Sequence, residues 1–206
     1  MSIDWKIIII IILGILLIYY LLTTFNESLY IKSDIDNHFY SIQKGDGKTE
    51  TFMKDSVNTL GEINIRITKL INHLVQNYSN DPDKNYFIKK LKENYDPHIL
   101  SEAAIDNRYT TYTIDKHNMH ICLRSRDEYE KLYNINTLIY VIFHEIGHLC
   151  NYDKNGNPIY GHGPEFMNIF KFLLEESIKI GIYKYEDYKS NPINYCGLVI
   201  SNNILG

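Results

Sequence analysis

The sequence predicts an α+β domain that follows an apolar N-terminal helix. Three observations lead to this fold class. Two short β-prone runs lie together near the middle of the chain, and stretches with the helical spacing of apolar residues flank them on both sides. An uncharged apolar run near the N-terminus is set apart from both. With 206 residues, 45% hydrophobic and 22% charged, the chain is long enough for one domain with a full core.

The N-terminal run contains no charged residue from Ile7 to Leu22, and uncharged residues extend it to Phe25. As a helix it would be roughly 28 Å long, close to the thickness of the hydrocarbon core of a bilayer. We expect residues 1–25 to form a transmembrane anchor that contacts the lipid bilayer through residues 7–25. A cleavable signal peptide is the alternative, but the run is longer than such peptides use and no A-x-A-like site follows it.

Basic residues on the two sides of this run give a slight bias of orientation. Lys6 and the terminal amine precede the run and Lys32 follows it, which favours a cytoplasmic N-terminus and an exoplasmic domain. Residues 26–60 are mixed and polar, and Lys44–Glu50 has the composition of a turn or linker. We therefore expect a stalk or domain edge over residues 26–60 and the folded domain over residues 61–206.

Local spacing predicts the elements of that domain. The expected helices are 64–78, 84–95, Ile135–Cys150 with Asn134 or Asn136 as its N-cap, and a helix that begins at Pro164 and stops at Gly181. The expected strands are Arg108–Ile114 and Met119–Arg124, joined as a hairpin, and a last short strand within Tyr195–Ser201.

Cysteine usage and net charge exclude some classes of protein. Cys122, Cys150 and Cys196 form no C-x-x-C pair and are odd in number, so we expect buried free thiols and no disulfide framework. The formal net charge is -4, which gives a nucleic-acid partner no electrostatic support from the whole chain.

The strongest chemical signal is the pentapeptide HEIGH, His144 to His148, inside an expected helix. Side chains four residues apart lie on one helix face, so both imidazoles can bind the same metal ion. Glu145 is rotated by about 100° around the axis, which places its carboxylate beside the metal without making it a ligand. The pattern predicts a zinc site in which the ion activates a water and Glu145 is the general base. The alternative is an ordinary pair of helix histidines, although buried imidazoles in so apolar a helix need polar partners.

The third ligand distinguishes the classes of zinc peptidase. The pattern H-E-x-x-H-x-x-G-x-x-H is excluded, because Asn151 and Lys154 stand where it requires glycine and histidine. His162 is the better candidate, since the polar segment before it can turn the chain back and its two flanking glycines allow a close backbone approach. A glutamate from the following helix is the alternative: Glu165, Glu175 or Glu176.

These motifs resemble a known family. HEIGH followed by a polar loop and GHGPEF resembles the SprT-like (Spartan) metalloproteases, and the segment from Met119 to His148 is similar to the related WLM domain peptidases. The whole looks most like the WLM/SprT-type proteins of large DNA viruses, and the resemblance is strong over Arg108–Phe166. It implies a zincin-like domain with one Zn²⁺. The implied site consists of the zinc ligands His144, His148 and His162 and the catalytic acid/base Glu145.

We therefore expect a zinc-dependent metalloendopeptidase that hydrolyses peptide bonds of a protein substrate, anchored in a host or virion membrane as a single-pass protein. The alternatives are a DNA-associated protease for DNA–protein crosslinks and a catalytically inactive, membrane-tethered zinc-binding module. We expect Met119–Arg124 to be an exposed edge strand that aligns an extended substrate, or else an ordinary core strand. Tyr160 is a candidate to stabilise the oxyanion.

Overall fold

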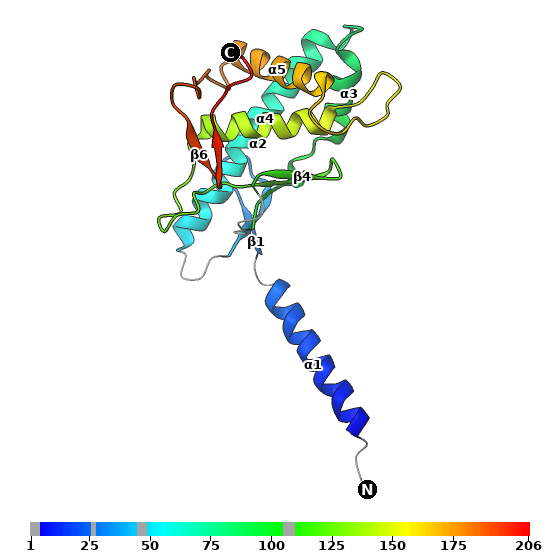
Figure 1. Ribbon diagram of the computed structural model, residues 1–206, viewed down its shortest axis with the longest axis vertical. Helices are drawn as coiled ribbons and strands as arrows, with labels where there is room; N and C mark the ends of the chain where they lie inside the picture. Colours follow the sequence, from blue (N-terminus) through cyan, green and yellow to red (C-terminus); the bar gives the residue numbers. More distant parts are fainter. Residues whose placement is uncertain (1–4, 26–27, 45–48, 105–109) are drawn as a thin grey trace.

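The computed structural model describes residues 5–25, 28–44, 49–104 and 110–206. Figure 1 shows a domain of strands and helices, from which the N-terminal helix extends away. The elements in chain order are α1 (Trp5–Phe25), β1 (Ser28–Lys32), β2 (Phe39–Gln43), α2 (Glu50–Tyr78), α3 (Asn85–Asn94), a 3-10 turn (Pro97–Ile99), β3 (Leu100–Glu102), β4 (Tyr112–Ile114), β5 (Asn118–Ile121), α4 (Ile135–Cys150), α5 (Pro164–Lys179), β6 (Ile193–Tyr195) and β7 (Leu198–Ile200). The predicted α+β class is confirmed.

Five of the strands form one mixed sheet in the order β1-β2-β3-β5-β4. The pairs β1–β2 and β4–β5 are antiparallel, whereas β3 joins them through two parallel pairings. A parallel pairing needs a long crossover, and α2 and α3 supply the one between β2 and β3. The order leaves β1 and β4 as the two edges of this sheet.

The domain begins earlier in the chain than the sequence predicted. α2 starts at Glu50, where the Thr49 hydroxyl caps the helix by accepting a hydrogen bond from the Phe52 N–H. Residues 26–60, expected as a stalk or domain edge, thus contribute edge strand β1, its neighbour β2 and the first part of α2. Most of the expected linker, residues 45–48, lies outside the described residues.

The remaining helices form where the local signals place them. α4 spans the predicted segment, and its N-cap is Asn134, whose side chain accepts from the Asn136 N–H at 2.8 Å. α5 begins at Pro164, and the chain leaves it through Gly181, whose φ of +71° suits glycine. The hairpin of β4 and β5 precedes α4 as predicted.

The core lies where the helices meet the sheet, and α4 runs through it. α4 packs against α3, α5 and β4, and Figure 1 shows it with α5 on the side of the sheet away from α1. Six of its apolar side chains are fully buried: Leu138, Ile139, Ile142, Phe143, Ile146 and Leu149. Burial of such side chains contributes about 1.5–3 kcal/mol each. Packing on several sides fixes the position of this helix and of the polar residues that it carries.

Two expectations about the C-terminal region are wrong. The single strand expected within Tyr195–Ser201 is a hairpin of β6 and β7, which turns at Cys196 and Gly197 with positive φ at both. Cys122 and Cys196, expected as free thiols, form a disulfide that joins this hairpin to the end of β5. The two cysteines are 74 residues apart, so no local spacing reveals the pair. Cys150 is a buried free thiol, as expected.

The expected N-terminal helix forms over Trp5–Phe25. Within the described parts of the chain, none of the helices combines the length and the hydropathy that a bilayer crossing requires. The transmembrane span of the predicted fold class is therefore not supported, and the bilayer contact through residues 7–25 stays a prediction.

Candidate metal centre

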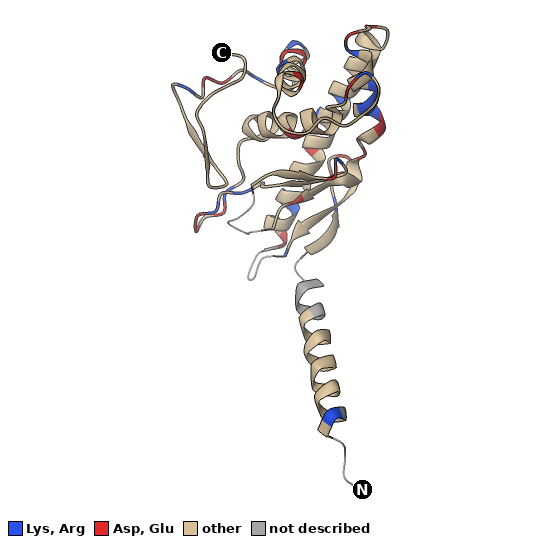
Figure 2. Ribbon diagram, turned by 45° about the vertical axis from the view of Figure 1, so that its right-hand side comes forward, with Lys and Arg blue, Asp and Glu red and all other residues tan. Residues whose placement is uncertain are grey.

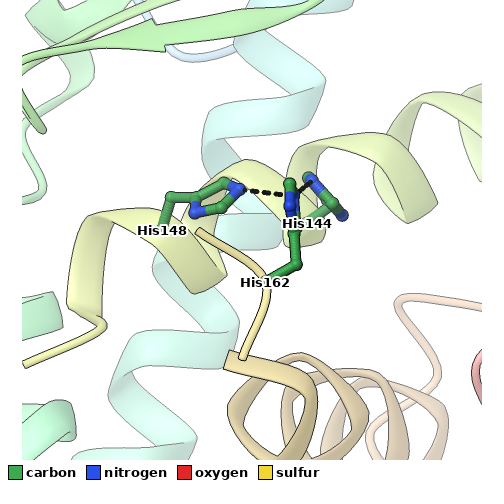
Figure 3. A group of neighbouring side chains, drawn as sticks. All are labelled: His144, His148 and His162. Carbon is green, nitrogen blue, oxygen red and sulfur yellow. Dashed lines mark hydrogen bonds between the residues drawn. The ribbon is translucent and has the colours of Figure 1, made fainter. Parts of the chain in front are cut away.

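α4 presents the first two histidines of the site. His144 and His148 lie one helical turn apart and their rings stand near each other, with centroids separated by 5.0 Å (Figure 3). Both side chains are half-buried, whereas most of the apolar residues around them are fully buried. The helix is held by packing on several sides, so the two imidazoles are fixed by the core.

The segment 151–163 brings a third histidine back to α4. Its course is set by its own polar residues: the Asp153 carboxylate accepts from two backbone N–H groups further along, and a β-bridge joins Tyr152 to Pro158. Gly161 then adopts a φ of +81°, a conformation that glycine reaches without strain. The chain thereby places the ring of His162 between the rings of the two helix histidines (Figure 3).

The three histidines converge on one point. The Nε2 atom of His162 lies 3.0 Å from Nε2 of His148 and 3.0 Å from Nε2 of His144. The ligand atoms of all three lie within 4.8 Å of one another. Tetrahedral zinc with Zn–N bonds of about 2.0–2.1 Å holds its nitrogens about 3.3 Å apart. The group could therefore hold a metal ion after a small outward movement of the rings.

Burial keeps the two helix histidines in the form that a metal binds. Burial, followed by the neighbouring imidazoles, lowers the pKa of His144 to about 4. The pKa of His148 is also lowered to about 4, by burial first and then by the charges of His162 and Lys116. Both rings are therefore neutral at pH 7, and neutral imidazole is the protonation state that zinc requires.

α5 backs the site with an aromatic ring. Phe166 is fully buried and stacks on His148 with a centroid distance of 4.2 Å, and it meets His144 and His162 edge-on at 4.9 and 4.8 Å. A Cβ atom at Gly147 would lie 3.0 Å from Phe166 Cε2, so a larger residue there would press on the ring. The glycine of HEIGH thus admits the ring that supports all three imidazoles.

Glu145 lies beside the triad in a nearly closed environment. Its side chain is 7% exposed, and its carboxylate accepts a hydrogen bond from the Thr113 hydroxyl of β4 at 2.8 Å. Burial raises the pKa of Glu145 to about 7, against the opposing effect of hydrogen bonds from the Thr113 hydroxyl and backbone. A carboxyl group with a pKa near neutrality suits a general base, because it can gain and release a proton at ordinary pH.

The triad and Glu145 line an open cleft of about 350 Å³ along β4. β4 is the edge strand here, and β5 lies between β3 and β4. The expectation that Met119–Arg124 forms the exposed edge is therefore wrong, and its alternative, a core strand, is confirmed. The difference arises because a hairpin does not reveal which of its two strands finds a further neighbour. Tyr160, the oxyanion candidate, also lines the cleft and is 77% exposed.

The alternative third ligands lie elsewhere. Glu176 is buried and bound to His73 at 2.8 Å and Lys179 at 2.5 Å. Glu165 is exposed at the start of α5, and Glu175 lies on the exposed side of that helix. Among the residues that the structure describes, the group that could hold a metal contains the three histidines and none of these glutamates.

Two residues that shape the site could not be predicted from the sequence. Thr113 holds Glu145, and Lys116 donates hydrogen bonds to backbone carbonyls around the end of α4. Each lies in the predicted hairpin, but its partner on the helix is 32 residues further along the chain. No pattern of spacing marks such a contact, because it exists only after hairpin and helix have packed together.

Comparison with curated proteins places the chain among proteins of large DNA viruses. It is 35% identical over 183 residues to the protein R325 of Acanthamoeba polyphaga mimivirus, an alignment that covers 88% of this chain and 87% of that one. The chain belongs to the family of R325. The protein 136R of Invertebrate iridescent virus 6 is 31% identical over 100 residues, 48% of this chain and 51% of that protein. The protein 042R of Invertebrate iridescent virus 3 is 31% identical over 120 residues, or 57% and 68%. All three are named as uncharacterized proteins.

No family model matches the chain. Among solved structures, the crystal structure of Wss1 from Saccharomyces cerevisiae is similar over 74% of this chain and 95% of that one, with 17% sequence identity and a TM-score of 0.44. The resemblance to the WLM/SprT-type metallopeptidases of large DNA viruses, expected from the motifs, is confirmed by the histidine triad together with the viral relatives.

Proposed function

We propose that this protein is a zinc-dependent metalloendopeptidase. The observation that carries the proposal is the convergence of three imidazoles beside the carboxyl group of Glu145, in an open cleft along an edge strand. Three histidine ligands leave the fourth position of a tetrahedral ion open, which is typical of catalytic zinc sites, whereas structural sites use four protein ligands. The motif resemblance supports the same activity.

The side chains at the site have distinct roles in the proposed reaction. His144, His148 and His162 would hold zinc, which when bound supplies Lewis acidity towards a water and a peptide carbonyl. Glu145 accepts the proton of the attacking water and passes it to the leaving amine, a role that its raised pKa favours. The Thr113 hydroxyl holds that carboxylate in one orientation. The burial of Glu145 limits exchange of its proton with bulk water.

The edge strand β4 favours a protein as the substrate. The outer side of β4 offers backbone groups that an extended peptide can pair with, in the manner of an added strand. Thr113 is the middle residue of β4, so a peptide paired along this edge would pass directly beside Glu145. We propose Tyr160, at the same cleft, as the group that donates to the developing oxyanion.

The distribution of charge favours protein over nucleic acid as the substrate. Figure 2 shows acidic and basic residues interspersed over the domain, and the whole chain has a formal net charge of -4. Proteins that bind nucleic acid present a basic patch or stripe to the phosphates. Stimulation of cleavage by DNA at physiological salt would instead favour a protease that acts on DNA–protein crosslinks.

Two variants test the proposal in a zinc-loaded protein with an unfolded protein as substrate. Glu145→Gln should keep one zinc per chain and lower the cleavage rate by roughly 10²–10⁴-fold, the usual contribution of a general base. His162→Ala should lose both zinc and cleavage. His98→Ala, which removes an exposed histidine of the 3-10 turn, is the matched control and should keep both.

Each contrary result has a definite meaning. Undiminished hydrolysis by the Glu145→Gln variant would refute its role as the base. Unchanged zinc content in the His162→Ala variant would move the third ligand to another residue. Tight zinc binding by the wild type without turnover of any unfolded protein would favour an inactive zinc-binding module.

A further inference from the structure

The turn between β4 and β5 is closed by an unfavourable pair of residues. Asp115 and Lys116 both have positive φ, 50° and 58°, and the His117 N–H donates to the Ile114 carbonyl at 2.9 Å. Residues with a Cβ atom adopt this conformation at a cost, and glycine or asparagine is preferred at such positions. A contact outside the turn must therefore compensate for a lysine here.

The Lys116 side chain is buried although it belongs to a turn, with 8% of the residue exposed. Its ammonium donates to the carbonyl of His148, to that of Asn151 at 3.3 Å and to that of Ile159 at 3.4 Å. An ammonium group has three N–H donors, and three carbonyls meet them. All three N–H donors of the lysine are therefore bound to backbone carbonyls.

Two aromatic rings complete this environment. The ring centroids of Tyr152 and Tyr160 lie 4.9 and 5.4 Å from the Lys116 ammonium, within the range of cation–π contacts. All five groups around the ammonium belong to the last turn of α4 or to the segment 151–163. These contacts offset the cost of burying a cation.

Two of these carbonyls lie close in the chain to the proposed metal ligands. The His148 carbonyl is in the last turn of α4, where unpaired carbonyls and the helix dipole favour a cation. Ile159 comes shortly before His162, and its own N–H donates to the Asn151 carbonyl at 2.9 Å. A displacement at Ile159 would therefore carry His162 away from the helix.

We propose that Lys116 is a positioning residue of the metal site. It clamps the segment 151–163 onto the end of α4 and so sets the distance between His162 and the two helix histidines. The inference rests on the proposed function for the role of His162 as a ligand. Since the same lysine sits in the turn that ends β4, the clamp also fixes the substrate edge relative to the metal ligands.

Three variants distinguish the effect of the Lys116 ammonium from the effect of backbone strain in the turn. Lys116→Met removes the ammonium and keeps much of the side-chain volume. Lys116→Gly also removes it but gives the turn the residue that its φ prefers, which by itself would stabilise the protein. Asp115→Gly is the matched control, because it relieves the same kind of strain at the neighbouring position and leaves the ammonium in place.

The first measurement uses metal-free protein in a chelator and follows amide hydrogen exchange of the segment 152–161. In both Lys116 variants we expect the Ile159 amide to exchange at least about ten-fold faster, as its hydrogen bond to Asn151 opens more often. The second measurement is zinc affinity by competition with a chelating dye. Loss of the Lys116 contacts should lower the zinc affinity on the order of 10–100-fold. Asp115→Gly should match the wild type in both.

The outcomes are distinct. Unchanged exchange of the segment in both Lys116 variants would overturn the clamp. Faster exchange with unchanged zinc affinity would overturn its role in positioning His162. If the wild type bound no zinc, the proposed function would fail, and the exchange measurement alone would decide whether the clamp exists. Should Lys116→Met fail to fold, the glycine variant carries the comparison, because its turn is the less strained of the two.

Discussion

The candidate metal site is held from two sides of different chemistry. On the side of the β4–β5 hairpin, single polar atoms reach α4: the Thr113 hydroxyl contacts Glu145, and the Lys116 ammonium contacts the carbonyls at the helix end. On the side of α5, the rings of Phe166 and Phe170 pack against His144. Ring packing thus determines where the imidazoles lie, whereas hydrogen bonds determine how individual atoms are directed. Damage to the aromatic side should remove the site, and damage to the hairpin side should impair it.

Phe166→Ala should have the largest effect of the changes considered, because it breaks the aromatic side. The ring is fully buried and contacts all three histidines, so its loss leaves a cavity and unsupported imidazoles. We expect the free energy of unfolding to fall by about 3–5 kcal/mol and zinc affinity to fall with it. Urea unfolding and metal titration measure the two effects.

The matched control is Phe172→Ala on the same helix. This ring packs against Tyr78 and Phe87, away from the triad. Its removal should destabilise the fold and leave zinc affinity close to that of the wild type. Equal loss of zinc by both variants would show that the aromatic side acts only through general stability.

Glu145→Gln should change stability in a pH-dependent way, through the polar side of the site. The folded pKa of Glu145 is about 7 and its ordinary value is 4.5. A raised pKa means that its contribution to stability is fully present below pH 4.5 and is lost as the pH rises through 7. The metal-free glutamine variant should therefore match the wild type at pH 4 and exceed it by up to about 3 kcal/mol at pH 8.

Urea unfolding of both proteins across this range, in a chelator, provides the measurement. Glu165→Gln, which changes an exposed glutamate nearby, should show no such growing difference. If the free energies of unfolding of Glu145→Gln and wild type differed by the same amount at all pH values, the raised pKa of Glu145 would be contradicted.

Thr113→Val should have the smallest effect, because it removes one hydrogen bond and keeps the shape of the side chain. The Thr113 backbone still supports Glu145, so the proposed base keeps its position but loses one contact that orients its carboxylate. We expect kcat to fall by about ten-fold, the equivalent of about 1.4 kcal/mol, while KM and zinc content stay the same. Thr113→Ser restores the hydroxyl and should restore kcat; equal kcat values for the valine and serine variants would argue against a role for the hydroxyl.

The parts of the fold defined by local spacing could be predicted from the sequence. α4 has its apolar period, its Asn134 cap and both helix histidines in one continuous segment, and the structure reproduces those bounds. The approach of His162 to His144 and His148 could be predicted as well, because helix geometry places the first two imidazoles on one face and the glycine-flanked loop has only a short distance to return. Such signals do not depend on the rest of the chain.

The parts that depend on distant partners could not be predicted. In the middle of α2, apolar and other residues alternate from Ile63 to Ile67 as they do in a strand, and Ile65 is 46% exposed between two buried isoleucines. Local spacing therefore did not reveal how far the helix extends. Which strand of the hairpin is the edge depends on β3, which lies earlier in the chain. Thr113 and Lys116 act only through contacts with α4, and nothing in their own neighbourhood distinguishes them from ordinary hairpin residues.

The disulfide between Cys122 and Cys196 has a topological consequence. It closes a covalent ring that contains α4, the segment 151–163 and α5, and therefore all three histidines. A single backbone cut at the exposed residues 154–158 would open this ring without dividing the molecule. A chain nicked there would migrate as one species on a denaturing gel without reductant and as two fragments after reduction. The domain can thus be cut once, between His148 and His162, and still be a single molecule.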